Sequence, residues 1–167
     1  YLAYDSLSAV NYTITSTSVS KYYWAENDSA FLNNEIKQYY SDTSEYISKN
    51  NPGNFDSLVY LTPVRNGAMA GYEVLVKNAS KSYFKKVRVV RNGDSVYHLS
   101  VLAPYAIITN DDNNKFFENF RFTKEDTATT LFINKTKMIV QDLSNTDSST
   151  REEAGESFRK LSFTKKD

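Results

Sequence analysis

The 167-residue chain contains no cysteine, and this absence excludes several kinds of chemistry at once. Without cysteine there is no disulfide, no thiolate nucleophile, no cysteine-ligated zinc and no iron–sulfur cluster. Only one histidine, His98, is present, so a site that needs a second imidazole or a thiolate beside it is excluded as well. The five glycines are scattered, so the chain has no glycine-rich loop of the kind that cradles phosphate.

The chain also has no excess of either charge and no long apolar run. Twenty basic and twenty acidic side chains cancel, and basic residues gather only in pairs such as Lys85-Lys86. No overall field therefore attracts the chain to nucleic acid or to an anionic membrane. Its apolar runs reach about five to seven residues, whereas a membrane helix needs about 20. We expect neither nucleic-acid binding nor membrane insertion.

The chain is instead rich in aromatic residues, with 13 Tyr and 10 Phe against two Met. Its composition, 40% apolar and 24% charged, is ordinary for a globular protein, and its length suffices for a core without covalent cross-links. The sequence starts with neither a methionine nor a charged-then-apolar leader. We therefore expect a domain or processed product of a larger protein, with a core and rim that rely on aromatic side chains.

The first 55 residues carry one strand pattern and one helix pattern. Polar and apolar residues alternate over residues 10–15, which is typical of a half-buried strand, and residues 21–24 are a candidate second edge. Residues 30–48 are predicted to form a helix, capped by Asp28 or Ser29 and ended by the Asn-Asn-Pro-Gly-Asn segment at 50–54. Its core-facing stripe repeats at steps of three and four: Leu32, Ile36, Tyr39, Thr43, Tyr46 and Ile47.

From residue 56 to residue 105 the period changes to two, which predicts an antiparallel sheet. Asn66-Gly67 and Asn92-Gly93 are turn signals, and the second lies between two β-rich runs. We expect Asn92-Gly93 to be the tip of a hairpin that pairs residues 87–90 with residues 96–99. A short helix at 115–119 then presents three aromatic side chains to the sheet: Phe116, Phe117 and Phe120.

The end of the chain repeats the order of features just before it. A hairpin, a polar stretch and a closing aromatic segment occupy 87–101, 110–114 and 116–126, and again 130–140, 144–149 and 157–167. The second copy predicts a hairpin with its turn at Asn134, then a short helix opened by the capping box Thr150–Glu153 and carrying Ala154 and Phe158. The alternative is chance similarity, because α+β chains commonly place strands after short helices.

Together these patterns predict an α+β fold. An antiparallel sheet is covered by one long helix and one or two short helices, and a hairpin, helix and strand half-repeat is appended. We assign residues 1–124 to the α+β domain and 125–167 to the half-repeat, docked on it as one structural unit. A hairpin with one short helix is too small to be stable alone. We expect it to dock on the first module, either by extending the sheet or by covering an open face, with Phe132, Met138, Val140, Phe158 and Phe163.

Residues 55–123 resemble the carboxy-terminal half of the PsbP-like family. The resemblance lies in the order of short motifs: Gly71-Tyr72-Glu73, Arg88-Val89-Val90, Asn92-Gly93, a Val-Tyr-x-Leu-x-Val-x-Ala-Pro run from Val96 to Pro104, and Phe116 to Phe122. The family's opening Tyr-Pro-x-x-Trp motif is absent. The resemblance implies an α/β/α sandwich that serves binding or assembly without common catalytic residues, as in accessory domains of bacterial extracytoplasmic proteins at the periplasm or cell surface.

Candidate catalytic and metal-binding residues are better explained by structure. His98 lies mid-strand without a histidine or cysteine partner, and Asp111-Asp112-Asn113-Asn114 lacks the ligand spacing of a calcium loop and suits a helix cap. Glu152, Glu153 and Glu156 fall in the first turns of a short helix, where negative charge is favourable. We therefore expect no catalytic residue, cofactor or metal site.

The cluster Tyr22, Tyr23 and Trp24, next to Lys21, is the candidate partner-binding site, because exposed aromatics beside a cation commonly anchor interfaces. The alternative is that these rings pack at the edge of the long helix. We expect a non-catalytic binding or assembly module, with a protein or a neighbouring domain of the same polypeptide as partner. The competing hypothesis is a small-ligand carrier or a hydrolase with a site that motifs do not reveal.

Overall fold

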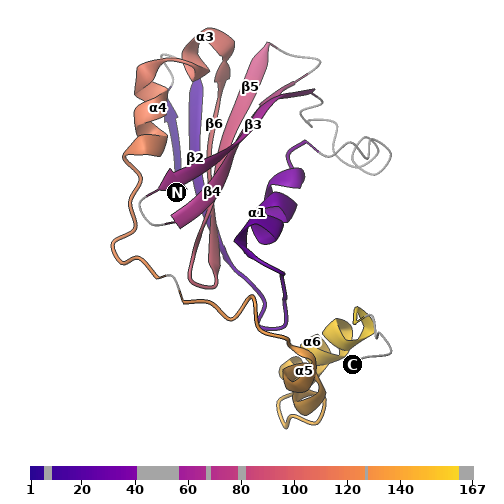
Figure 1. Ribbon diagram of the computed structural model, residues 1–167. Coiled ribbons are helices and arrows are strands. Elements are labelled where there is room, and N and C mark those ends of the chain that lie inside the picture. Colours follow the sequence, from indigo (N-terminus) through magenta and orange to yellow (C-terminus); the bar gives the residue numbers. More distant parts are fainter. Residues whose placement is uncertain (6–8, 41–56, 67–68, 79–81, 127, 162–167) are drawn as a thin grey trace.

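We analysed a computed structural model of the chain, which describes residues 1–5, 9–40, 57–66, 69–78, 82–126 and 128–161. Within these residues, six strands form one antiparallel sheet in the order β1-β2-β6-β5-β4-β3 (Figure 1). The strands are β1 (Leu2–Asp5), β2 (Val10–Ser18), β3 (Ser57–Asn66), β4 (Met69–Lys77), β5 (Tyr83–Asn92) and β6 (Ser95–Pro104). The antiparallel α+β architecture predicted from the sequence is confirmed.

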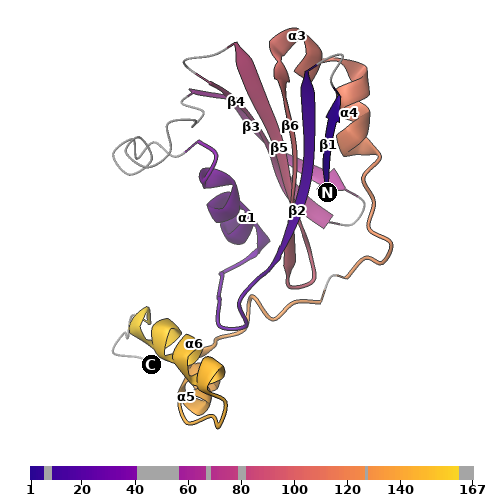
Figure 2. The ribbon, with the colours of Figure 1, turned by 180° about the vertical axis from the view of Figure 1, so that it is seen from behind.

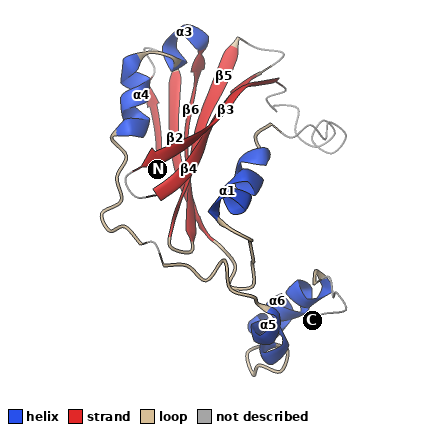
Figure 3. Ribbon diagram, viewed as in Figure 1, coloured by secondary structure: helices blue, strands red, loops and turns tan. Residues whose placement is uncertain are grey.

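The helices divide between the two faces and one end of the sheet. They are α1 (Asp28–Lys37), α3 (Tyr105–Ile108), α4 (Asp111–Glu118), α5 (Thr136–Asp142) and α6 (Ser148–Arg159). Figures 1 and 2 show α1 on one face and α4 on the other, so helices cover the sheet from both sides. Helices α5 and α6 pack on each other beyond the end of the sheet that carries the β5–β6 turn (Figure 3).

The central strands are buried on both faces, which explains their nearly continuous apolar runs. Because side chains alternate along a strand, β5 sends Val87 and Val89 to the α1 side and Val90 to the α4 side. The α1 side is completed by the buried side chains Phe31, Leu32, Ile36, Val74, Val76, Val96 and Leu131. The α4 side is completed by Val10, Leu75, Leu99, Val101, Ala103, Ile108 and Phe117.

The hairpin between β5 and β6 is confirmed, with its turn one residue later than predicted. Val90 pairs with Tyr97 and Asn92 pairs with Ser95, so the two-residue loop consists of Gly93 and Asp94. Gly93 has a φ of 60°, and Asp94 is not among the described residues with positive φ. A positive φ at the first loop position only is the pattern of a type II′ turn, which favours glycine there.

Helix α1 is shorter than predicted. It begins two residues earlier than expected, because the Asn27 side chain caps it by accepting a hydrogen bond from the backbone N–H of Ala30 at 2.9 Å. It ends at Lys37, where the N–H groups of Tyr39 and Tyr40 bond to carbonyls three residues back. These tight turns let Tyr39 leave the helix and reach the sheet. The remainder of the predicted helix, residues 41–48, lies outside the described residues.

The predicted second hairpin is wrong, because residues that were assigned to its strands form helix α5. The Asn134 side chain accepts a hydrogen bond from the N–H of Thr136 at 2.8 Å and so leads into the helix instead of closing a hairpin turn. The following helix does carry Ala154 and Phe158, but its N-cap is Asp147, which accepts from the N–H of Thr150. The predicted closing strand lies almost wholly outside the described residues.

The side chains proposed to cover the first module are also different. Phe132, Met138, Val140 and Phe158 are exposed, and Phe163 lies outside the described residues. Leu131, Ile139 and Ala154 are buried instead. A helix presents a different set of side chains to its neighbours than a strand does, so the change of element exchanges the buried and exposed residues.

Candidate binding cavity

The segment that carries Tyr22, Tyr23 and Trp24 forms a loop between β2 and α1, not a second edge strand. Both ends of this loop are fixed by backbone hydrogen bonds. The N–H of Val19 bonds to the carbonyl of Asp94 at 2.8 Å, and the N–H of Ala25 bonds to the carbonyl of Leu131 at 2.9 Å. The loop is therefore held between the β5–β6 turn and the segment that leads into α5.

Tyr22 joins this loop to the α5–α6 pair. Its ring is 5% exposed and packs with Ile139 and Ala154 in a small core. Its hydroxyl donates a hydrogen bond to Asp142 at 2.8 Å, and Lys21 forms an ion pair with the same carboxylate at 2.9 Å. The hydrogen bond from Lys21 is the main cause that lowers the pKa of Asp142. The buried Tyr22 thus anchors the loop to both helices.

A cavity of about 540 Å³ lies between the loop and the two helices, within the size range of small-ligand sites. Its lining comes from the loop, the start of α5 and the end of α6: Ser20, Tyr22, Tyr23, Trp24, Asn134, Lys135, Thr136, Ile139, Ser157, Lys160 and Leu161. Trp24, the only tryptophan of the chain, exposes 55% of its surface. The buried Tyr22 and the exposed Trp24 therefore lie two residues apart in the sequence and line the same cavity.

The charged part of the lining is cationic. Among the described residues that line the cavity, Lys135 and Lys160 are charged and none is acidic. Lys135 is only 3% exposed, and burial lowers the pKa of its ammonium, an effect that the charge of Asp94 partly offsets. The described residues give this ammonium neither a hydrogen bond nor an ion pair. The cavity wall thus holds a desolvated, unpaired cation.

The three aromatic residues singled out in the sequence have three different environments. Tyr22 packs on α5 and α6, whereas Tyr23 packs edge-on against Phe31 of α1 with ring centroids 5.7 Å apart. The alternative expectation, that these rings pack at the edge of the long helix, therefore applies to Tyr23, whereas Trp24 is exposed. Lys135 was not predicted as a site residue because residues 130–140 read as a hairpin, and nothing in the sequence around Lys160 distinguishes it from a surface lysine. The signal that indicates a helix here is Asn134, whose side chain accepts a hydrogen bond from the N–H of Thr136 in the first turn of α5.

A second polar cluster surrounds His98 on the α1 side of the sheet, the face opposite Tyr97 and Leu99, as the strand pattern predicts. Its Nδ1 lies 2.8 Å from the Tyr39 hydroxyl, and its Nε2 lies 3.6 Å from the Glu35 carboxylate. Burial raises the pKa of Tyr39 to about 12, so the hydroxyl stays protonated near neutral pH. Burial first, and the charge of Lys85 second, lower the pKa of His98. The cluster joins the end of α1 to the sheet.

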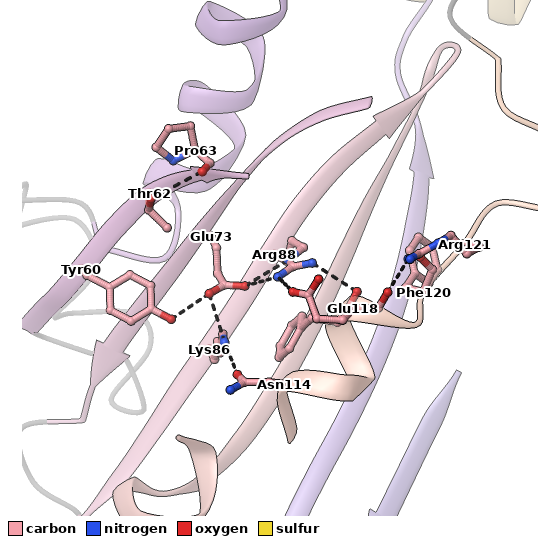
Figure 4. Close-up of polar contacts among 11 residues, drawn as sticks. Tyr60, Thr62, Pro63, Glu73, Lys86, Arg88, Asn114, Glu118, Phe120 and Arg121 are labelled. Carbon is pink, nitrogen blue, oxygen red and sulfur yellow. Dashed lines mark hydrogen bonds and ion pairs between the residues drawn. The ribbon is translucent and has the colours of Figure 1, made fainter. Parts of the chain in front are cut away.

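A third cluster lies buried under α4 and is built around Glu73 (Figure 4). Arg88 donates to Glu73 Oε2 from Nε at 3.0 Å and from Nη2 at 2.8 Å. Lys86 lies 3.1 Å from Glu73 Oε1, and Tyr60 donates to the same oxygen at 2.8 Å. Arg88 also donates to the carbonyl of Phe117 and to Glu118, which fastens α4 to the sheet.

The remaining candidate residues have structural roles. Asp111 opens α4, whose N-cap is Asn110, and the Asn110 side chain accepts from the N–H of Asn113 at 2.9 Å. Glu152, Glu153 and Glu156 lie on the exposed surface of α6. The described residues contain no group of three His, Asp or Glu side chains placed to hold a metal ion. None of their helices is long and apolar enough to span a membrane.

Comparison with known proteins leaves the fold and the cavity as the features that define this chain. No protein-family model matches the sequence, and a search of curated proteins finds no match. The structure by itself defines an α+β protein with a six-stranded antiparallel sheet in its described part, and with helices on both sheet faces. The cavity beside Trp24 is the feature from which a function can be inferred.

Proposed function

We propose that the chain is a non-catalytic binding module and that the cavity beside Trp24 is its binding site. The observation that carries this proposal is the convergence of Tyr22, Tyr23 and Trp24 with α5 and α6 around one cavity. Interface anchors are commonly aromatic rings set beside well-packed neighbours, and Trp24 with Tyr22 meets that description.

The composition of the lining favours binding over hydrolysis. General acid–base catalysis of hydrolysis most often uses an imidazole or a carboxylate at hydrogen-bonding distance from the substrate. In the described part of the chain, the cavity lining contains hydroxyl, amide and ammonium groups but no Asp, Glu or His. A small-ligand carrier is the second candidate, which the cavity volume of about 540 Å³ favours because it lies within the size range of small-ligand sites.

The wider role that we propose is that of an accessory domain in a bacterial extracytoplasmic protein, with a PsbP-like sandwich fold. This part of the proposal rests on the motif order from Gly71 to Phe122. The presence of helices on both faces of the sheet supports it, because the resemblance implies an α/β/α sandwich. A protein segment or a neighbouring domain is then the natural partner of the cavity.

The proposal is tested by the fluorescence of Trp24, which reports on the cavity without a label because the chain has no other tryptophan. A library of short peptides and small metabolites is screened for shifts in Trp24 emission, and hits are confirmed by calorimetry. We expect Tyr23→Ala to weaken binding of each hit, whereas Tyr105→Ala leaves it unchanged. Tyr105 is a matched control, since it is 52% exposed and lies on α3 at the other end of the sheet.

Two results would contradict the proposal. One is a set of confirmed hits that bind as tightly to the Tyr23→Ala variant as to the unchanged chain. The other is chemical conversion of a bound hit, detected by NMR of the ligand after incubation, that a substitution in the cavity abolishes. The second result would make the chain an enzyme.

A further inference from the structure

We propose that the cavity selects ligands with a carboxylate attached to an apolar body, and that Lys135 and Lys160 receive the carboxylate. This inference rests on the proposed binding function and adds the chemical class of the ligand. It follows from the charges of the lining, from the environment of Lys135 and from the apolar surfaces that share the cavity.

The charge of the lining has one sign. Lys135 and Lys160 bring two positive charges to the cavity, and no acidic side chain among its described lining residues opposes them. Asp94, which is not among those lining residues, offsets part of the effect of burial on Lys135. In the whole chain acidic and basic side chains are equal in number, so this local excess does not follow from composition. A cavity lined by charge of one sign attracts ligands of the opposite sign.

Lys135 supplies the second argument, because a buried ammonium normally has a partner. Only 3% of the surface of this residue is exposed, yet its ammonium has no hydrogen bond or ion pair with the described residues. No side-chain nitrogen in the described residues is both fully buried and unpaired. The small accessible part of Lys135 therefore includes its ammonium, and the residue lines the cavity. A carboxylate there would restore the interactions that burial removed.

The apolar surfaces fix the rest of the ligand. Tyr22, Ile139 and Leu161 give the cavity aliphatic and aromatic walls, and Trp24 adds a partly exposed ring. Such walls favour an alkyl or aromatic body over a small inorganic anion, because they gain from apolar burial. Two sources share this chemistry: a small apolar carboxylate, and the carboxy terminus of a polypeptide that ends in apolar residues.

The test compares ligands that differ only in their head group. Octanoate, octanol and octylamine are titrated into the full chain while Trp24 emission is followed. We expect octanoate to bind at least about tenfold more tightly than octanol, since a hydrogen bond to a charged group contributes about 1.5–3 kcal/mol. Octylamine should bind most weakly. Equal affinity for octanoate and octanol would overturn the inference and leave the binding function standing.

A second pair of probes distinguishes the two sources. A tetrapeptide that ends in two leucines is compared with the same peptide as its carboxy-terminal amide. Tighter binding of the free acid than of both octanoate and the amide indicates a polypeptide terminus, whereas tighter binding of octanoate indicates a small molecule. If none of the carboxylates shifts Trp24 emission, the inference is wrong; the screen described above then decides the binding function separately.

Matched variants assign the effect to the two lysines. We expect Lys160→Met, at an exposed position, and Lys135→Met to lower octanoate affinity by about tenfold each and to leave octanol affinity unchanged. Lys137→Met is the control, because Lys137 lies exposed on α5, two residues after Lys135, and is not among the residues that line the cavity. Thermal unfolding verifies that the Lys135 variant is folded, and Lys135→Arg, which keeps the charge, should retain selectivity. Loss of octanol binding in step with octanoate binding would contradict a specific role in charge recognition.

Discussion

Glu73 is the residue through which the charges under α4 are balanced. Its Oε2 atom pairs with Arg88 and its Oε1 atom pairs with Lys86, and both of these basic residues are nearly buried. The Oε1 atom also accepts a hydrogen bond from the Tyr60 hydroxyl. Buried charges are costly unless each has a partner, so the group behaves as one unit. The charge of Glu73 is second only to burial among the causes that raise the pKa of Tyr60.

We predict that Glu73→Gln lowers the free energy of unfolding by about 3 kcal/mol, because it leaves Lys86 and part of the Arg88 interaction without a buried counter-charge. Urea denaturation measures the change. Glu118→Gln is the control: its carboxylate bonds to the same guanidinium, but its side chain is 65% exposed, so its loss should cost less than about 1 kcal/mol. Equal costs for the two variants would show that burial of Glu73 is not what makes the cluster important.

His98 allows a prediction of pH dependence. Its pKa is lowered in the folded protein, so the unfolded chain takes up the proton first as the pH falls. The stability that neutral His98 contributes is fully present above its ordinary pKa of about 6.5 and is lost as the pH falls through the lowered pKa. Each unit by which the pKa is lowered corresponds to about 1.4 kcal/mol.

The variant His98→Gln removes this titration while retaining a group able to accept a hydrogen bond from Tyr39. We expect the wild-type chain to lose stability relative to the variant as the pH falls below about 6.5, with a constant difference above that value. Burial raises the pKa of Glu35, an effect of opposite sign that remains in both proteins. Unfolding midpoints are measured in urea at closely spaced pH values. A parallel pair of curves would refute a role for His98.

At the scale of elements, the strands of the sheet could be predicted from the sequence more accurately than the helices. Long alternating runs and the Asn92-Gly93 signal predicted the β5–β6 hairpin to within one residue, because a two-residue turn has few possible chemistries. The run from 130 to 140 was misread because a short apolar stretch does not distinguish a strand from a helix. Tertiary contacts determine whether such a stretch is a strand or a helix, and they cannot be seen in the local sequence. Here Ile139 packs against Tyr22, which lies far away in the chain.

The same reasoning explains how much of the cavity could be predicted. Tyr22, Tyr23 and Trp24 stand out as an aromatic cluster in the sequence, and all three line the cavity. Lys135 and Lys160 look like ordinary surface lysines, since nothing local shows that one of them becomes buried. The site is assembled from segments separated by more than a hundred residues, and only the tertiary fold brings them together.

Helix α5 makes a prediction that separates it from the hairpin expected at the same place. Ile139 is 1% exposed and Val140 is 51% exposed, so we predict that Ile139→Ala destabilises the α5–α6 pair by about 2–4 kcal/mol while Val140→Ala has little effect. Hydrogen exchange of the α5 and α6 amides measures the local stability. In the hairpin arrangement Val140 would be the buried residue, so a larger effect of Val140→Ala than of Ile139→Ala would support a hairpin in place of α5.

At the scale of the whole molecule, the segment before α5 joins the helical pair to the sheet. Asn92 and Gly93 bond to Asp126, and Asp94 accepts hydrogen bonds from Thr129 and Thr130. Leu131 then enters the core on the α1 side, where it is 1% exposed. The β5–β6 turn therefore holds Asp126 and residues 129–131 against the sheet, and this attachment positions α5 and α6, which come next in the chain.

This attachment predicts different outcomes for two truncations. A chain that ends at residue 133 keeps Leu131 and the contacts of the β5–β6 turn, but it loses both helices and uncovers Tyr22. A chain that ends at residue 125 also loses Leu131, whose burial contributes about 1.5–3 kcal/mol, together with the hydrogen bonds to Asp94. The longer fragment should therefore unfold at a clearly higher temperature than the shorter one, and Trp24 emission should change in both because the cavity is gone. If the chain ending at 125 unfolds at the same temperature as the full chain, residues 126–167 contribute nothing to the stability of the sheet, and the view of the chain as one structural unit is wrong.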